Sequence, residues 1–253
     1  MESLEKNEAP ASQEDRVAYA PETLPFDTPR SFDYLRKHFF SRVLTFLVRL
    51  VADPLLILIN GIWLGFRVHG LNNRKSIRDR GAVSVCNHVH PMDCTMIDLV
   101  MHRRIYYVSL EENFRVPGVR HLIRVLGAVP LSRNPHCMKE MLFSMEEALK
   151  DNAVVQVYPE GLLHPYCDRL RPFKNGAFRL AATAQVPILP MVFTYHRAWG
   201  LRRLFTKKPT LHLHILPAVF PAENESIRDT AECMKIACIQ EMTRKQQAEA
   251  AKM

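Results

Sequence analysis

The chain has 253 residues, of which 47% are hydrophobic and 24% are charged, and its formal net charge is +8. This composition excludes a disordered or fibrous chain and predicts a globular protein with a packed core. Residues 1–30 hold three Lys/Arg and seven Asp/Glu, so they carry −4 and the rest of the chain carries +12. A basic body favours an anionic partner such as a lipid surface, a phosphorylated ligand or nucleic acid.

Residues 1–30 are polar and rich in proline, and they predict a disordered or loosely ordered arm. Residues 32–51 then show helical periodicity, with apolar side chains on one side and a stripe of His, Arg and Thr on the other. Pro54 is expected to break or kink this helix. The 13 uncharged residues from Pro54 to Phe66 are too few to span a bilayer, which needs roughly 20.

Two interpretations of residues 31–68 therefore remain open. One is an amphipathic and apolar helical hairpin that lies in one leaflet of a membrane, with its arginines toward the lipid head groups. The other is a helical layer packed on the protein core.

From residue 82 onward, short apolar runs alternate with helical patterns. The runs predicted as strands are 82–86, 105–110, 129–131, 153–158, 188–194 and 210–216. The segments predicted as helices are 91–103, 117–126, 136–150, 176–184 and a last helix whose capping box is Ser226 and Asp229. The alternation predicts an α/β fold with a mixed, largely parallel sheet flanked by helices. We expect residues 69–253 to form this domain.

The segment Asn87-His88-Val89-His90-Pro91-Met92-Asp93 carries the strongest chemical signal. Proline is favoured at the first helical position, so Pro91 predicts a helix that begins here with Asp93 in its first turn. The helix dipole favours an ionised carboxylate at that position. Asp93 could reach back to His88 and leave the outer ring nitrogen free as a base. The alternative is a capping aspartate beside an incidental histidine.

Three further segments end predicted strands. The segment Gly127–Arg133 ends in Arg133, and an arginine at the end of a strand can bind a phosphate group through two parallel hydrogen bonds. The turn Pro159-Glu160-Gly161 is followed by Phe173-Lys174-Asn175-Gly176, and Val186–Pro190 is a strand bracketed by prolines. Because ligands bind at the carboxyl ends of strands in such sheets, we expect Arg133 and Glu160 to share one cleft with His88. Singly, each of these segments also fits ordinary solvated residues.

In this order and at these separations, the four segments resemble the glycerolipid acyltransferase family, which includes bacterial 1-acylglycerol-3-phosphate acyltransferases. The family pattern is N-H-x4-D, a strand ending in arginine, a P-E-G turn and a V-P-(I/V)-x-P strand. The stretch from Glu112 to Pro117 is also similar to the family's E-L-F-K-I-P. The resemblance covers about residues 60–216, and the family's membrane-embedded N-terminal helices favour membrane contact for residues 31–68.

The resemblance implies transfer of a fatty acyl group from acyl-CoA or acyl-carrier protein to a hydroxyl of a lysoglycerolipid, with lysophosphatidic acid expected first. His88 would be the general base and Asp93 would orient it. It implies no cofactor beyond the acyl donor, and a place on the cytoplasmic face of a membrane as a monotopic or peripheral protein. The pairs His88/His90 and His212/His214 are read as non-metal, because neither has a convincing third ligand.

Two departures from the family pattern concern the acceptor's phosphate. The P-E-G turn continues Leu162-Leu163 where the family has Thr-Arg, and Glu111 stands where the family has lysine. We therefore expect Glu160 and Gly161 to bind substrate together with a different basic set. That set is Arg133, Arg171 and Lys174. The alternative is that the acceptor is another lysolipid.

Three other classes of protein fit the sequence less well. A non-catalytic lipid-binding relative is disfavoured by the intact His88 and Asp93 pair. A nucleic-acid binder is disfavoured because the basic residues are not interleaved with aromatic residues. A serine hydrolase would need a G-x-S-x-G motif, which the sequence lacks. The six cysteines form no C-x-x-C pair, and the acidic start shows no secretory signal, so reduced thiols in a cytosolic setting are expected.

Overall fold

The computed structural model describes residues 26–252 apart from 117, 199–202, 204–205 and 207. In this part of the chain, seven strands form one sheet in the order β1-β7-β6-β2-β5-β3-β4. The strands are β1 (Arg67–His69), β2 (Ala82–Cys86), β3 (Ile105–Leu110), β4 (Ala128–Leu131), β5 (Val154–Val157), β6 (Ile188–His196) and β7 (Thr210–Ile215). Among these pairings β6–β7 is antiparallel and the others are parallel, which confirms the predicted mixed, largely parallel sheet.

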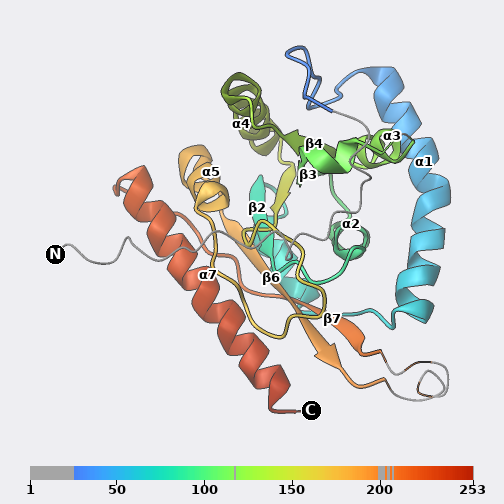
Figure 1. Cartoon of the computed structure of the whole chain (residues 1–253). Coiled ribbons are helices and arrows are strands. Elements are labelled where there is room, and N and C mark those ends of the chain that lie inside the picture. The colour runs from blue at the N-terminus through green and yellow to red at the C-terminus, as the bar shows by residue number, and fades with distance from the viewer. Residues whose placement is uncertain (1–25, 117, 199–202, 204–205, 207, 253) are drawn as a thin grey trace.

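Helices cover both faces of this sheet (Figure 1). The described α-helices are α1 (Phe39–Leu58), α2 (Asp93–Met101), α3 (Val119–Val125), α4 (Pro135–Lys150), α5 (Gly176–Ala184) and α7 (Ile227–Ala250). Helices α4, α5 and α7 pack on β5, β2 and β6 respectively, while α2 packs against β3. The long helix α7 begins at the predicted cap, where Ser226 Oγ accepts a hydrogen bond from the backbone N–H of Asp229 at 3.1 Å.

Strand β2 shows how the short apolar runs produce this architecture. All five of its residues are buried. Val83 and Val85 enter one core layer, with the residues of α4, α5 and α7, whereas Ala82 and Cys86 enter the other, with Met96 of α2. Successive side chains of a strand point to opposite faces, so a strand covered on both faces must be apolar throughout.

The N-terminal region differs from the expected helical hairpin. Helix α1 is one continuous helix that contains Pro54, and it passes into a π-helical turn at Ile59–Trp63. A proline inside a helix removes one backbone hydrogen bond and kinks the helix without reversing it, and the residues that follow Pro54 are apolar rather than turn-forming. The chain therefore continues through the proline, and the π-helical turn is a second irregularity close after it.

Helix α1 also turns its apolar side outward. None of its residues is buried, and among the other labelled helices its main contacts are with α2 and α3. Arg49 points toward the protein and donates two hydrogen bonds to Asp98 of α2, at 2.6 and 2.8 Å. The segment Phe39–Ile62 is long and apolar enough to cross a membrane, by length and composition alone. The membrane interpretation of residues 31–68 placed the arginines toward the lipid head groups, and Arg49 instead pairs with Asp98.

Candidate active site

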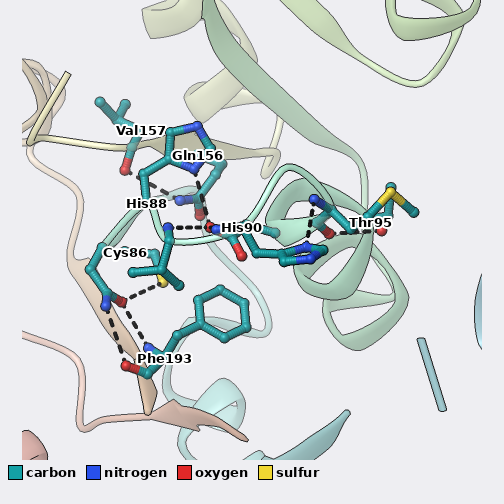
Figure 2. Close-up of polar contacts among 11 residues, drawn as sticks. Cys86, His88, His90, Thr95, Gln156, Val157 and Phe193 are labelled. Carbon is teal, nitrogen blue, oxygen red and sulfur yellow. Dashed lines mark hydrogen bonds and ion pairs between the residues drawn. The ribbon is translucent and has the colours of Figure 1, made fainter. Parts of the chain in front are cut away.

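The site is built on the loop that follows β2. Asn87, fully buried, clamps this loop to β6: its Oδ1 accepts a hydrogen bond from the backbone N–H of Phe193 at 2.8 Å, and its Nδ2 donates to the Phe193 carbonyl at 3.2 Å. Figure 2 shows this clamp below the loop, with the rings of His88 and His90 leaving the loop in different directions. The His88 ring lies on the side of Gln156 and Val157 of β5.

Asp93 is fully buried and lies at the start of α2. Its Oδ2 accepts hydrogen bonds from the backbone N–H groups of Val89 at 2.7 Å and His90 at 3.0 Å. The same oxygen lies 3.1 Å from Nδ1 of His88. The helix starts at Asp93, two residues after the expected Pro91, but the carboxylate still occupies the first turn. The structure therefore brings His88 and Asp93 within hydrogen-bond reach.

The two ring nitrogens of His88 differ, because Nδ1 lies next to Asp93 and Nε2 does not. Its ring stacks on Tyr158 with the ring centroids 4.1 Å apart and an interplanar angle of 18°. The side chain is 24% exposed, and no described residue hydrogen-bonds to Nε2. The carboxylate holds Nδ1 as the protonated nitrogen, so Nε2 carries the free lone pair. This arrangement can accept a proton from a bound hydroxyl.

Glu160 lies beside His88, because β5 pairs with β2. Its carboxylate is 7% exposed and accepts a hydrogen bond from the backbone N–H of Arg171 at 3.3 Å. Burial raises the pKa of Glu160 to about 7, although the backbone N–H groups of Arg171 and His88 act in the opposite direction. A carboxyl group of that pKa can donate or accept a hydrogen bond near neutral pH.

The other predicted residues of this turn gather around Glu160. Gly161 has φ +78°, and a Cβ atom there would lie 2.8 Å from Nζ of Lys174, so only glycine fits without strain. The backbone N–H of Lys174 donates to the Pro159 carbonyl at 2.9 Å. The structure thus places Glu160, Gly161, Arg171 and Lys174 together, next to the His88 loop.

Arg133 lies at the end of another strand, β4. Strand β3 stands between β4, which delivers Arg133, and β5, which delivers Glu160. The Arg133 guanidinium is largely exposed and donates to Glu112 at 2.6 Å. It lines a hollow of about 380 Å³, and neither His88 nor Glu160 is among the residues that line this hollow. None of these contacts joins Arg133 to Glu160 or to His88, so the cleft shared by Arg133 and Glu160 stays a prediction.

Glu111 has a role that the sequence did not reveal. Its carboxylate is buried, and it accepts hydrogen bonds from the backbone and the hydroxyl of Thr28 and from the backbone N–H of Arg133. Burial opposes its ionisation, but the hydrogen bonds from Thr28 and Ser132 outweigh it, so the pKa of Glu111 lies below its usual value. Glu111 thus anchors the end of the N-terminal arm, whose residues 1–25 lie outside the described part of the chain.

The segment after Gly161 also has a structural task. The backbone N–H of His164 donates to the His88 carbonyl at 2.9 Å, and that of Tyr166 donates to the Val89 carbonyl at 3.1 Å. The stretch that contains Leu162 and Leu163 is half-buried and continues into this contact. The backbone of this segment therefore stabilises the loop that carries His88.

Comparison of the sequence with known proteins identifies a family and several relatives. Residues 65–194 match the family model described as acyltransferase. The chain is 31% identical over 159 residues to the 1-acyl-sn-glycerol-3-phosphate acyltransferase beta of Homo sapiens, covering 61% of this chain and 56% of the human protein. It is 33% identical over 125 residues to a chloroplastic 1-acyl-sn-glycerol-3-phosphate acyltransferase of Brassica napus, covering 49% and 36% respectively. The chain thus spans about half or less of the length of these relatives.

A solved structure shares the architecture. The crystal structure of the 1-acyl-sn-glycerophosphate acyltransferase of Thermotoga maritima aligns with a TM-score of 0.54, at 21% identity, over 83% of this chain and 84% of that one. At this identity the match shows the fold alone.

Proposed function

Because the chain belongs to the acyltransferase family, we propose that it moves a fatty acyl group from acyl-CoA or acyl-carrier protein to a hydroxyl of a lysoglycerolipid, with lysophosphatidic acid the first acceptor, in phospholipid synthesis. The relatives from Homo sapiens and Brassica napus are named for the acylation of 1-acyl-sn-glycerol-3-phosphate. The observation that carries the proposal is the His88 ring, held through Nδ1 at 3.1 Å from the buried Asp93, with no described partner at Nε2.

The proposed reaction needs no covalent enzyme intermediate. Nε2 of His88 takes the proton of the acceptor hydroxyl as the oxygen attacks the thioester carbon. The tetrahedral intermediate then collapses, the carbon–sulfur bond breaks, and the departing thiolate takes the proton from His88. Asp93 keeps the ring in the correct tautomer and stabilises the imidazolium that forms between the two steps. Such proton transfer contributes roughly 10²–10⁴ in rate.

The direct test is acyl transfer by the purified chain, with lysophosphatidic acid and either acyl-CoA or acylated carrier protein. We expect His88→Ala to lower kcat/KM by roughly 10²–10⁴. His136→Ala is the matched control, because His136 is exposed on α4 and its described hydrogen bond is with Asn134 rather than with the His88 loop. Acyl transfer by His88→Ala at the rate of the control would refute the base assignment. Lipid binding without any acyl transfer by the unmodified chain would favour the non-catalytic alternative.

The acceptor is a finer proposal. Arg171 and Lys174 lie around Glu160 and next to His88, so we place the acceptor's phosphate with them. Arg133 remains a candidate through its separate hollow. A panel of lysolipids, assayed with Arg133→Ala, Arg171→Ala and Lys174→Ala, separates the possibilities. Best turnover on lysophosphatidic acid that none of these substitutions changes would contradict both the alternative basic set and a different lysolipid.

We also propose that the chain acts on the cytoplasmic face of a membrane, as a monotopic or peripheral protein. Two features support this: the outward apolar side of α1 and the +12 charge of the chain beyond residue 30. Basic proteins are drawn to the anionic lipids of the cytoplasmic leaflet.

A further inference from the structure

A second group of chemically active side chains lies on β1, β7 and β6 and at the end of α7, and none of them belongs to the site around His88. Strands β1, β7 and β6 are neighbours there, and they carry His69, His212, His214 and His196. Helix α7, which packs on β6, adds Glu249 from its last turn. In the paired strands His69 stands opposite His214. Four imidazoles and one carboxylate therefore meet where three strands and one helix come together.

Three of these side chains converge most closely. The ligand atoms offered by His196, His214 and Glu249 all lie within 4.8 Å of one another. The Thr194 hydroxyl lies 2.9 Å from Nε2 of His214 and 3.3 Å from Nε2 of His196, so these two nitrogens face the same point. Oε2 of Glu249 lies 3.6 Å from Nε2 of His196. In a tetrahedral zinc site with bonds of about 2.0–2.1 Å, the ligand atoms lie about 3.3 Å apart, so small side-chain movements suffice.

His214 is the most buried of the three side chains. This residue is 2% exposed, and its Nδ1 has no hydrogen-bond partner among the described residues. Buried polar atoms in folded proteins almost always have a partner, so a water molecule is expected at Nδ1, which leaves Nε2 as the nitrogen that faces His196. The hydroxyl of Thr194 satisfies only the other nitrogen of the ring.

The hydrogen bonds of Glu249 leave one of its carboxylate oxygens facing the histidines. Oε1 of Glu249 accepts from Lys245 at 2.7 Å and from Lys252 at 2.8 Å, while Oε2 lies 3.6 Å from Nε2 of His196. The two lysines would then hold a ligating carboxylate in place, as outer partners do in known metal sites.

We propose that His196, His214 and Glu249 bind one divalent transition-metal ion, Zn²⁺ in the first place, with His212 stacked on His196 as part of the surrounding shell. Two neutral imidazoles and a carboxylate are ligands that Zn²⁺ accepts, with a water molecule as fourth ligand. The ion tethers the end of α7 to β6 and β7. It takes no part in the proposed acyl transfer, since His88 lies at the end of β2 instead.

The test uses the full chain without an affinity tag, freed of metal by chelation and dialysis. Zn²⁺ is titrated calorimetrically, and Co²⁺ is titrated by visible absorption, because cobalt spectra distinguish nitrogen and oxygen ligands from thiolates. We expect one ion per chain, cobalt bands without sulfur-to-metal charge transfer, and a higher Tm on adding Zn²⁺. The variants His196→Gln and Glu249→Gln should weaken binding by at least about tenfold. His136→Ala, an exposed histidine on α4, is the matched control.

Three results would overturn the proposal. They are equal binding by the unmodified chain and by His196→Gln, a thiolate signature in the cobalt spectrum, and no rise in Tm with Zn²⁺. If His196→Gln does not fold, as judged by circular dichroism, Glu249→Gln decides the question, since it preserves the shape of the side chain. Because these readouts do not measure acyl transfer, they stand or fall independently of the proposed function.

Discussion

The carboxylate of Asp93 accepts three hydrogen bonds through a single oxygen, two from backbone N–H groups and one from His88. Replacing it with asparagine keeps the shape but removes the charge that stabilises an imidazolium. We predict that Asp93→Asn lowers kcat by roughly 10²–10⁴. Steady-state kinetics with the acceptor and donor that the unmodified chain prefers would measure this.

The matched control is Asp98→Asn on the same helix, because Asp98 binds Arg49 of α1 rather than the His88 loop. We expect this variant to retain kcat within a small factor. Equal kcat values for the two variants would mean that Asp93 serves the fold and not the base.

Glu160 gives a second prediction at the scale of one residue. Its folded-state pKa of about 7 lies above the ordinary value of 4.5. The folded state therefore binds the proton more tightly, so this contribution to stability is full below pH 4.5 and is lost as the pH rises through 7. The loss amounts to at most about 3 kcal/mol. We predict that the stability of the unmodified chain falls from pH 5 to pH 8 more steeply than that of Glu160→Gln.

Urea unfolding at several pH values measures this difference, and effects of other groups cancel when the two proteins are subtracted. Glu232→Gln is the control, because Glu232 is exposed on α7. If Glu160→Gln and Glu232→Gln give the same dependence on pH, the carboxyl group of Glu160 does not have a raised pKa.

At the scale of elements, one ion pair holds α1 to the domain. Asp98 is nearly buried, and it accepts from both Arg49 and the hydroxyl of Tyr107. Removing the guanidinium would leave this carboxylate without its cation. We predict that Arg49→Ala destabilises the attachment of α1 by about 2 kcal/mol. Faster amide hydrogen exchange along Phe39–Leu58, with little change in β2, would show it.

Arg42→Ala is the control on the same helix, because Arg42 is exposed. Equal exchange in the two variants would show that packing against α2 and α3, and not the ion pair, holds α1 in place.

The elements were predictable from the sequence to different degrees. The strand at 105–110 and the helix at 176–184 match the structure to the residue, because their apolar periodicity is local and their ends carry turn signals. Strand β1 was missed, since its three residues alternate in exposure and give no apolar run. The hairpin was wrong because a proline alone does not reverse a chain.

At the scale of the whole molecule, contacts between residues far apart in the chain could not be predicted from the sequence. His88 and Asp93 are five residues apart, so the loop between them determines their contact. The relation of Arg133 to Glu160 depends instead on strand order, and β3 lies between their strands. The contact of Thr28 with Glu111 spans 83 positions. The group around His214 needs partners from β6 and the end of α7, which is why the pair His212 and His214 seemed to lack a third ligand.

The outward side of α1 leads to a prediction for the whole molecule. Phe40 is 83% exposed, and Phe46 and Val51 are also largely exposed on the same helix. Contiguous apolar surface of this kind is rare on soluble monomers and marks a site of membrane or protein contact. Since the rest of the chain is basic, anionic vesicles are the partner that matches both features. We predict that the unmodified chain floats with vesicles that contain phosphatidylserine, and that Phe40→Asp combined with Phe46→Asp abolishes flotation.

The control for this experiment is Phe143→Asp, which places the same charge at an exposed aromatic residue of α4. It should leave flotation unchanged, because α4 packs on the sheet at a distance from α1. Activity toward a water-soluble, short-chain acceptor separates attachment from chemistry: the double variant should retain it, since neither phenylalanine contacts the His88 loop. Flotation of the double variant at the level of the Phe143→Asp control would place the membrane contact on another surface, and the basic body alone would then have to account for binding.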